Sequence, residues 1–279
     1  MMSSPYVVIG ATGAQGGAVA TALLARTLPV RAVVRRPEST RARRLADAGA
    51  SLAVADLDDP KSLAAAFAGA AGVFALTTPF ERGPDEEVSQ GMSIIEAAST
   101  AGVPHLVFSS VASADRHTGI PHFESKAVVE AALMRSGVAS TIVGPTYFYD
   151  NLLAGIDQVR GGVLELAIGE DTPLQQLSRR DLGEFVATVF EDPARHVGLR
   201  IDIASDSPTP AQMAEALGQR LGRTVRLRTV DASDIGSADM RAMFGYLTDT
   251  GYAADIPALH TAYPAVGWQS FTDWLDETL

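Results

Sequence analysis

A run of closely spaced glycines near the start of the chain has the residue types of a phosphate-binding turn. Residues 6–17 read Tyr-Val-Val-Ile-Gly-Ala-Thr-Gly-Ala-Gln-Gly-Gly, and the alanine-rich segment 18–26 follows directly. Gly10 and Gly13 allow a sharp turn between a predicted strand and a predicted helix, and Gly16 removes a side chain where the two meet. The start of such a helix presents unpaired N–H groups and the positive end of its dipole, which suits a pyrophosphate. The spacing predicts a dinucleotide-binding strand–turn–helix in its G-x-x-G-x-x-G form, not the commoner G-x-G-x-x-G.

Arginines follow the second predicted strand, residues 30–34. An NAD-preferring site carries an acidic residue at the end of this strand, to accept a hydrogen bond from the ribose 2′-hydroxyl. This chain has Arg35 and Arg36 there, and a guanidinium suits a 2′-phosphate through forked, charge-assisted hydrogen bonds. We therefore expect NADP(H) to be preferred over NAD(H), with Arg35 as the main phosphate ligand. Arg41 and Arg43 are expected on the solvated face of the next helix.

Acidic residues follow the third predicted strand. Asp56 directly follows this strand, residues 51–55, and is a candidate acceptor for the adenine amino group. The alternative is that Asp56 caps the helix that begins near Pro60, but Asp58 or Asp59 is better placed for that role. We favour the adenine contact for Asp56.

Hydroxyl residues follow the fourth predicted strand, residues 73–76. Thr77 and Thr78 come next and could donate to a phosphate or a ribose, but they could equally be ordinary loop residues. Further on, Lys126 is one of only two lysines among 22 basic residues, the other being Lys61. In such an arginine-biased chain, a lysine at the start of a helix indicates that its compact ammonium matters, although a solvent-facing lysine is the alternative.

These segments, in this order, resemble the NmrA-like family of atypical short-chain dehydrogenases/reductases. The matching pieces cover about the first 155 residues, and their order adds specificity. The pieces are Gly10–Gly16, Asp56–Asp59, Phe108–Val111, His122–Lys126 and Gly144–Leu152. The closing helix around Trp274 resembles the end of the family more weakly.

The resemblance implies a site in which each matching position has a role. Lys126 would lie against the nicotinamide ribose, and Arg35 would bind the 2′-phosphate. The other implied cofactor-binding residues are Gly10, Thr12, Gly13, Gln15, Gly16, Asp56, Leu57, Thr77, Thr78, Ser109, Pro145, Thr146, Tyr147 and Phe148. The implied substrate-facing residues are Phe80, Ser110, His122, Tyr147 and Asn151.

One position departs from ordinary short-chain dehydrogenases. Those enzymes use a Tyr-x-x-x-Lys pair, in which the lysine lowers the tyrosine pKa for proton transfer to a carbonyl oxygen. Here His122 stands four residues before Lys126, and no Tyr-x-x-x-Lys occurs elsewhere, so alcohol–ketone interconversion by that route is not expected. His122 is a candidate proton donor, with a purely structural histidine as the alternative. Tyr147 and Tyr149 are further candidates.

Short apolar strands alternate with amphipathic helices in the first half of the chain. This predicts an α/β fold with a doubly wound parallel Rossmann sheet in residues 1–150. Residues 151–279 are less regular, and we expect a smaller, interleaved α/β subdomain there that supplies the substrate lid. Its predicted strands are 162–168, 199–204 and 225–230, and its predicted helices are 179–190, 209–221 and 271–279. A helix start is indicated by Thr209 as N-cap with Pro210 after it.

Composition limits the other classes of function. The chain has 279 residues, a net charge of −11 and no cysteine. The negative charge argues against nucleic acid or anionic membrane as a partner, and the missing thiols exclude disulfides and thiolate metal sites. No metal site is expected. The opening Met-Met-Ser-Ser-Pro leaves no room for a leader before the first strand, and no run has the length of a membrane span, so a cytoplasmic protein is expected.

Two functions fit these residues. The first is an NADPH-dependent reductase that transfers hydride to a small conjugated acceptor such as a quinone, enone or imine. The second is a non-catalytic NADP(H)-binding redox sensor that acts through a protein partner. A scaffold with neither role is a third reading. Lys126 and the nicotinamide-pocket residues favour the reductase, whereas the missing tyrosine favours the sensor. A homodimer is left open.

Overall fold

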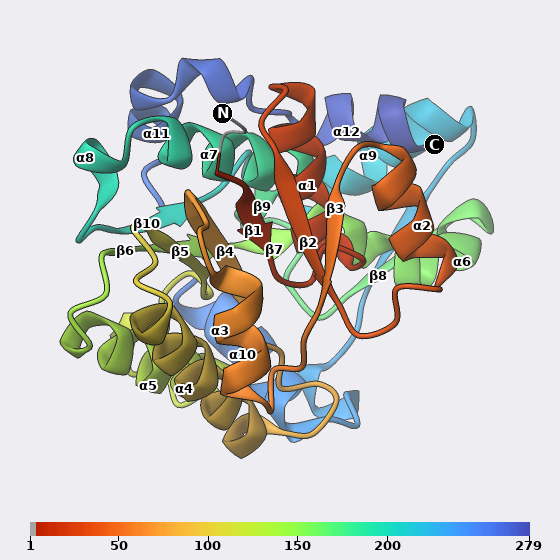
Figure 1. Cartoon of the computed structure of the whole chain (residues 1–279). Coiled ribbons are helices and arrows are strands. Elements are labelled where there is room, and N and C mark those ends of the chain that lie inside the picture. Colours follow the sequence, from red (N-terminus) through yellow and green to blue (C-terminus); the bar gives the residue numbers. More distant parts are fainter. Residues whose placement is uncertain (1–3) are drawn as a thin grey trace.

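The centre of the fold is a seven-stranded, all-parallel sheet, which the computed structural model places within the described residues 4–279 (Figure 1). The strand order is β10-β6-β5-β4-β1-β2-β3, so the order reverses next to β1. The strands are β1 (Tyr6–Val8), β2 (Val30–Val34), β3 (Ser51–Val54), β4 (Gly72–Leu76), β5 (Leu106–Ser109), β6 (Ser140–Pro145) and β10 (Arg200–Ile203). This arrangement confirms the predicted doubly wound Rossmann sheet. The expectation about a leader rests partly on residues 1–3, which lie outside the described residues.

Helices cover both faces of this sheet because successive strand side chains point to opposite faces. Val8 and Phe74 point into one apolar cluster, whereas Val7 and Val73 point into the other. The first cluster is covered by α1 (Ala14–Ala25), α2 (Thr40–Asp47) and α7 (Arg179–Glu191). The second is covered by α3 (Pro60–Phe67), α4 (Pro84–Thr100) and α5 (Pro121–Arg135).

Helices α1 and α7 pack closely because of one glycine. A Cβ added at Gly183 of α7 would lie 2.5 Å from the carbonyl oxygen of Ala18 on α1, a distance that real Cβ atoms do not show. The second half of the chain therefore contributes both a covering helix, α7, and an edge strand, β10, to the Rossmann core.

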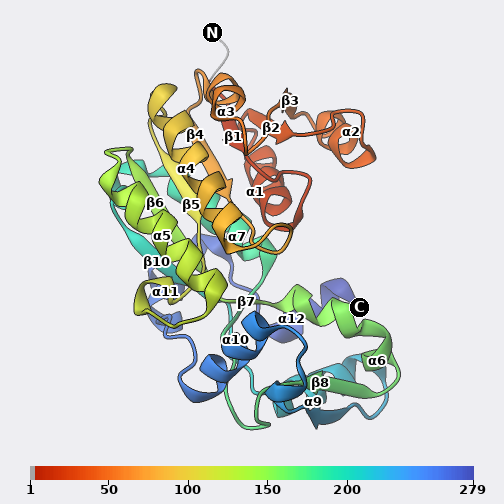
Figure 2. The same cartoon turned by 90° about the horizontal axis from the view of Figure 1, so that it is seen from below.

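The rest of the second half forms a smaller α/β portion beside the sheet (Figure 2). Two small parallel sheets pair β8 with β11 and β7 with β9. The strands are β7 (Tyr147–Phe148), β8 (Val163–Leu166), β9 (Gln176–Leu177) and β11 (Arg226–Thr229). The helices are α6 (Ile156–Arg160), α8 (Pro193–His196), α9 (Pro210–Leu221), α10 (Ala238–Asp249), α11 (Ile256–Ala262) and α12 (Phe271–Thr278).

The sequence predicted part of this portion. Strands β8, β10 and β11 and helices α7, α9 and α12 form where they were expected. Thr209 caps α9 and Pro210 follows it, as predicted, and Gln212 completes a capping box. Helices α6, α8, α10 and α11 and the two-residue strands β7 and β9 were not predicted.

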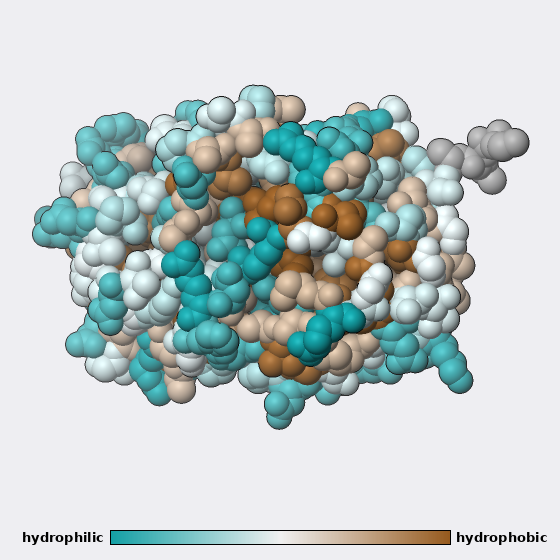
Figure 3. Space-filling model, turned by 90° about the vertical axis from the view of Figure 1, so that its left-hand side faces the viewer, coloured by the Kyte–Doolittle hydropathy of each residue, from teal (hydrophilic) through white to brown (hydrophobic). Residues whose placement is uncertain are grey.

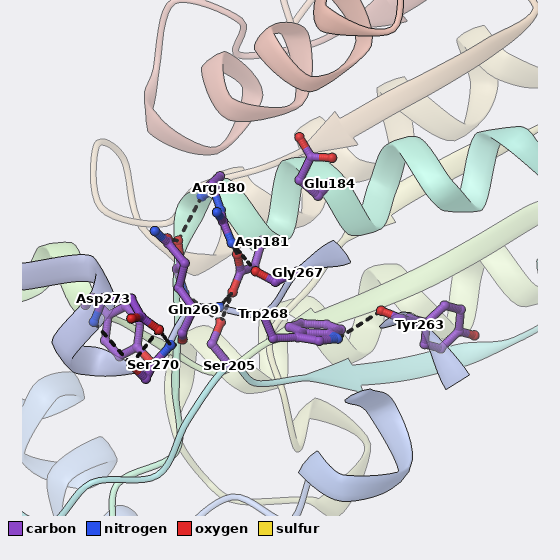
Figure 4. A network of polar contacts seen from close by, with 12 residues as sticks. Arg180, Asp181, Glu184, Ser205, Tyr263, Gly267, Trp268, Gln269, Ser270 and Asp273 are labelled. Atoms are coloured by element: carbon purple, nitrogen blue, oxygen red, sulfur yellow. Dashed lines mark hydrogen bonds and ion pairs between the residues drawn. The ribbon is translucent and has the colours of Figure 1, made fainter. Parts of the chain in front are cut away.

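A buried carboxylate, Asp181 of α7, holds the last segment of the chain in place (Figure 4). Its Oδ2 accepts from the Ser205 hydroxyl at 2.6 Å and from the Gln269 backbone N–H at 2.8 Å. Arg180 pairs with the same carboxylate and also donates to the Gly267 carbonyl. Burial raises the pKa of Asp181, and these hydrogen bonds and the nearby arginine oppose that rise.

The surface carries few large apolar side chains. The exposed ones in residues 4–279 are Val54, Phe80, Met92, Val128, Met134, Val197 and Leu199. Figure 3 shows one face, on which hydrophobic side chains gather near the centre among hydrophilic and neutral ones. None of the helices in the described part of the chain is long and apolar enough to cross a membrane.

Candidate functional site

One large cavity lies at the carboxyl ends of the sheet strands, between the sheet and the smaller portion. Its volume is about 910 Å³. It is lined by residues at or just after the ends of six core strands, including Gly10, Arg35, Asp56, Thr77 and Ser110, and α10 contributes to the opposite wall. This is where open α/β sheets bind their ligands. Every residue of the implied cofactor and substrate sites except Ser109 lines this cavity, whereas the further candidates Arg36 and Tyr149 do not.

The glycine turn has the shape that a pyrophosphate needs. Gly10 has a φ of +68°, which favours glycine. A Cβ at Gly16 would lie 2.4 Å from the Gly10 carbonyl, so Gly16 allows the close contact of helix and turn. Gly13 has an ordinary φ of −97°, but its backbone N–H donates to the Gly10 carbonyl at 2.8 Å and so closes the turn. No side chain caps α1, so its first-turn amides can bind an anion. These residues fit a bound dinucleotide.

Ser109 acts indirectly, which corrects its predicted place in the cofactor site. It does not line the cavity. Its hydroxyl donates to Oε1 of Gln15 at 2.7 Å, and Gln15 does line the cavity. Ser109 therefore orients a residue of the glycine turn.

The part of the cavity beside the ends of β2 and β3 carries Arg35 and Asp56. Arg35 is 68% exposed and lies 3.8 Å from Glu81, a surface pair of small energy that a phosphate can replace. Arg36 does not line the cavity. Oδ1 of Asp56 accepts from a neighbouring backbone N–H, while Asp59 caps α3, as the sequence favoured.

Arg41 reaches further than the sequence predicted. It is exposed at the start of α2, but its Nη1 lies 3.5 Å from the carbonyl oxygen of Thr12 in the glycine turn. The prediction that Arg41 lies on the solvated face of the helix is confirmed, and the contact with Thr12 is additional to it. A contact between segments 29 residues apart in sequence leaves no local signal.

Lys126 is buried, which excludes the solvent-facing alternative. The side chain is 8% exposed. Its Nζ lies 2.8 Å from Oε1 of Glu87 and donates to the Thr77 carbonyl at 2.7 Å and the Thr77 hydroxyl at 3.0 Å. Burial lowers the pKa of Lys126, and the Glu87 carboxylate opposes that shift.

Glu87 of α4 was not predicted from the sequence as a residue of the site. Its side chain is fully buried, and Oε2 accepts from the Ser125 hydroxyl at 2.5 Å while Oε1 accepts from Thr77 at 3.0 Å. A buried charge needs a partner, so Glu87 and Lys126 depend on each other.

His122 lies one helical turn before Lys126 on α5, and both line the cavity. Its Nδ1 lies 2.7 Å from Oδ1 of Asp239, at the start of α10. This distance is that of a charge-assisted hydrogen bond. The His122 ring also lies 5.7 Å from the ring of Phe80, which is 70% exposed. Asp239 was not predicted.

The candidate tyrosines differ in their surroundings. Tyr147 is half-buried and lines the cavity, and burial raises the pKa of its hydroxyl. Tyr149 is fully buried and donates to the Gln269 carbonyl at 3.1 Å. It does not line the cavity, so the suggestion that Tyr149 is a proton donor was wrong.

Ser110 and Asn151 also line the cavity, as do Thr78, Leu57, Pro145, Thr146 and Phe148. The Ser110 hydroxyl donates to Glu130, which in turn pairs with Arg200 at 2.8 Å. The cavity also contains side chains that the sequence reading did not single out. They are Asp150 and Arg179, which pair at 3.2 Å, and Met240, Met243, Phe244 and Tyr252.

Comparison with known proteins agrees with this fold. The model of the NmrA-like family matches residues 2–274, and the chain belongs to that family. It is an NmrA-like oxidoreductase with a Rossmann-type NAD(P)-binding fold.

Two curated relatives illustrate the match. The chain is 31% identical to the NmrA-like family domain-containing oxidoreductase FrzB of Cladobotryum sp., over 90% of this chain and 85% of that protein. It is 30% identical to an NAD(P)H azoreductase of Xenophilus azovorans, over 79% and 75% of the two chains.

Two solved structures share the fold. The NADPH-dependent quinone oxidoreductase QOR2 of Escherichia coli, complexed with NADPH, has a TM-score of 0.83 at 24% identity and covers 98% and 99% of the two chains. The triphenylmethane reductase of Citrobacter sp., complexed with NADP(H), has a TM-score of 0.85 at 22% identity, with 98% and 100% covered.

Proposed function

We propose that this protein is an NADPH-dependent reductase of a small conjugated acceptor such as a quinone, enone or imine. One observation carries the proposal: a single cavity joins the glycine turn to the buried Lys126, to His122 and to apolar side chains of the smaller portion. Relatives named as an azoreductase and a quinone oxidoreductase support the reaction class.

The reduced nicotinamide supplies a hydride when it is bound. The glycine turn holds the pyrophosphate, Arg35 binds the 2′-phosphate and Asp56 contacts the adenine. Lys126 lies against the nicotinamide ribose, where Glu87 and Thr77 fix its ammonium group. Pro145, Thr146, Tyr147 and Phe148 form the wall of the nicotinamide pocket.

Reduction of a neutral acceptor also requires a proton. His122 is the donor in this proposal, because Asp239 fixes its Nδ1–H and thereby directs Nε2 toward a ligand. Phe80, Ser110, Tyr147 and Asn151 surround the acceptor, and residues 151–279 supply the part of the chain that closes over it.

The experiment is NADPH consumption by the purified protein against quinones, enones, imines and aldehydes, with NADPH binding followed by fluorescence in the same samples. Sustained oxidation that depends on the acceptor would support the reductase. Tight NADPH binding with no turnover on any acceptor would contradict it and favour the redox sensor, for which a protein partner would then be sought.

A further inference from the structure

A second cavity opens beside the main one, inside the smaller portion of the fold. Its volume is about 350 Å³, which is in the range of ligand pockets by itself. It lies between η2 (Tyr149–Gly155), α6, β8 and α10. The two cavities share five lining residues, which are Tyr147, Asn151, Ala154, Met240 and Phe244. We call this second cavity the side chamber.

The side chamber has mostly hydrocarbon walls. Its apolar lining includes Leu152, Val159, Leu164, Leu166, Met213, Val230 and Ile235. Two of the polar residues in its wall contact other residues: the Gln176 amide contacts the Met213 sulfur at 3.2 Å, and Glu165 pairs with Arg228. No arginine, lysine or histidine is among the described residues that line it, so an anionic group inside would lose its hydration without gaining a counter-ion. An apolar group would gain by leaving water.

Two side chains of α10 form part of the wall between the two cavities. Met240 and Phe244 are one turn apart on α10 and line both cavities. The ring of Phe244 lies 6.3 Å from that of Tyr147. Methionine adopts many rotamers at little cost, so this wall can yield to a ligand that passes from one cavity to the other.

We propose that the acceptor has two parts: a conjugated head that is reduced in the main cavity, and an uncharged apolar arm that occupies the side chamber. This inference rests on the proposed reductase function and names the kind of acceptor it uses. The main cavity must hold a whole dinucleotide as well as the reacting head, so the side chamber is the available space for a further group. An alkyl, prenyl or aryl arm has the required chemistry, whereas a phosphate, carboxylate or sugar does not.

Gly155 offers a way to fill the side chamber without disturbing the main cavity. It lines only the side chamber, and a Cβ added there would meet just one atom within 4 Å, Oε1 of Gln158 at 4.0 Å. Gly245 of α10 is a matched control, because it lines neither cavity and a Cβ there would meet nothing within 4 Å.

The test uses 2-methyl-1,4-naphthoquinone and its 3-propyl and 3-hexyl derivatives. Their affinities are measured by calorimetry with NADP⁺ present, and their turnover with NADPH is measured separately. In the parent protein, affinity should rise about fourfold for each methylene that enters the side chamber, until the chamber is full. In Gly155→Leu, the affinity for the 3-hexyl derivative should be within about twofold of the affinity for 2-methyl-1,4-naphthoquinone itself. In Gly245→Leu, the affinity should depend on arm length as it does in the parent protein.

Two results would overturn the inference: equal affinities for all three quinones in the parent protein, or a parallel loss for all three in Gly155→Leu. Long-chain quinones tend to leave water whichever protein is present, so comparing the parent with the two variants cancels this contribution to the affinity. If affinity depends on the arm as expected but neither these quinones nor any other acceptor is turned over, the side chamber is supported and the reductase proposal itself fails.

Discussion

Nδ1 of His122 lies 2.7 Å from Oδ1 of Asp239, so a carboxylate on α10 faces an imidazole on α5 across 117 positions of sequence. The pair links the Rossmann core to the smaller portion at the cavity wall. A carboxylate at Nδ1 fixes the orientation of the ring. In the proposed reductase, His122 would take the place of the tyrosine in the Tyr-x-x-x-Lys pattern, and Asp239 would be its positioning residue.

Replacing Asp239 tests whether it assists proton transfer without affecting hydride transfer. An enone needs a hydride at carbon and a proton for the resulting enolate, whereas a triarylmethyl cation needs only the hydride. Asp239→Asn should lower kcat for enones about tenfold or more, because it weakens a general acid, and should change kcat for the cationic dye less than about twofold. Steady-state kinetics with both acceptors measures the difference.

Asp231→Asn is the control for that experiment, because Asp231 caps a 3₁₀ turn in the same portion of the fold and lies outside the cavity. It should leave both acceptors unaffected. An equal fall for enone and dye in Asp239→Asn would mean that Asp239 only supports the fold. For enone reduction, a solvent deuterium isotope effect no larger in Asp239→Asn than in the parent would also contradict the proton-donor role.

Charge reversal at Arg35 tests the cofactor preference. Arg35→Glu should weaken NADPH binding by about 1.5–3 kcal/mol, the range for a hydrogen bond to a charged group, and should leave NADH binding nearly unchanged. Arg36→Glu is the matched control because Arg36 is exposed and lies outside the cavity lining. Fluorescence titration gives both affinities. Equal affinities of the unmodified protein for NADPH and NADH would contradict the proposed role.

The buried pair of Glu87 and Lys126 is expected to be strongly coupled. Glu87→Ala leaves the lysine ammonium buried without its counter-ion and should reduce the free energy of unfolding by about 3–5 kcal/mol. Glu96→Ala, on the exposed face of the same helix, should change it by less than about 0.5 kcal/mol. Denaturant titration measures both. A Glu87→Leu/Lys126→Met double variant as unstable as Glu87→Ala would contradict this account.

His105 should make stability depend on pH. Its Nε2 lies 2.8 Å from the Thr141 hydroxyl, which itself donates to the His196 carbonyl, so the neutral ring carries its proton on Nε2. Burial, and to a lesser extent the charge of His196, lowers the pKa of His105 from 6.5 to about 4. The folded state therefore binds fewer protons than the unfolded state between these values, and stability falls as the pH is lowered through this range.

The loss from His105 alone should reach about 3 kcal/mol near pH 4, since each pKa unit corresponds to about 1.4 kcal/mol. Denaturant unfolding at several pH values measures it. His105→Gln should flatten the slope between pH 6.5 and 4, whereas His117→Asn, at an exposed position, should not. Equal slopes in the parent and His105→Gln would show that other groups cause the acid sensitivity.

The sequence predicted the features that local pattern determines. The glycine turn, the arginine after β2 and the His122–Lys126 spacing each lie within a few residues, so strand and helix periodicity places them at one edge of the sheet. Partners that meet only in the folded chain were missed. Glu87 looks like one of three acidic residues in the first turn of α4, and nothing near it in sequence reveals that it is buried beside Lys126.

The smaller portion was harder to predict for a similar reason. Helix α10 has three buried or half-buried methionine and phenylalanine residues, but glycines at 236 and 245 and polar neighbours obscure their periodicity. Its position over the cavity follows from packing against Tyr147 and the His122–Asp239 contact, both of which are long-range. Tyr149 was misread because a residue next to a strand end can point into the protein instead of the cleft.

The central claim is that this cavity transfers hydride from NADPH to an acceptor carbon, and NADPH deuterated at the transferable C4 position tests it most directly. After incubation with an enone, mass spectrometry of the product measures the label. We predict one deuterium at the β-carbon of the saturated ketone, together with a primary isotope effect on single-turnover oxidation. A product without deuterium, or bound cofactor that no acceptor oxidises, would contradict the account.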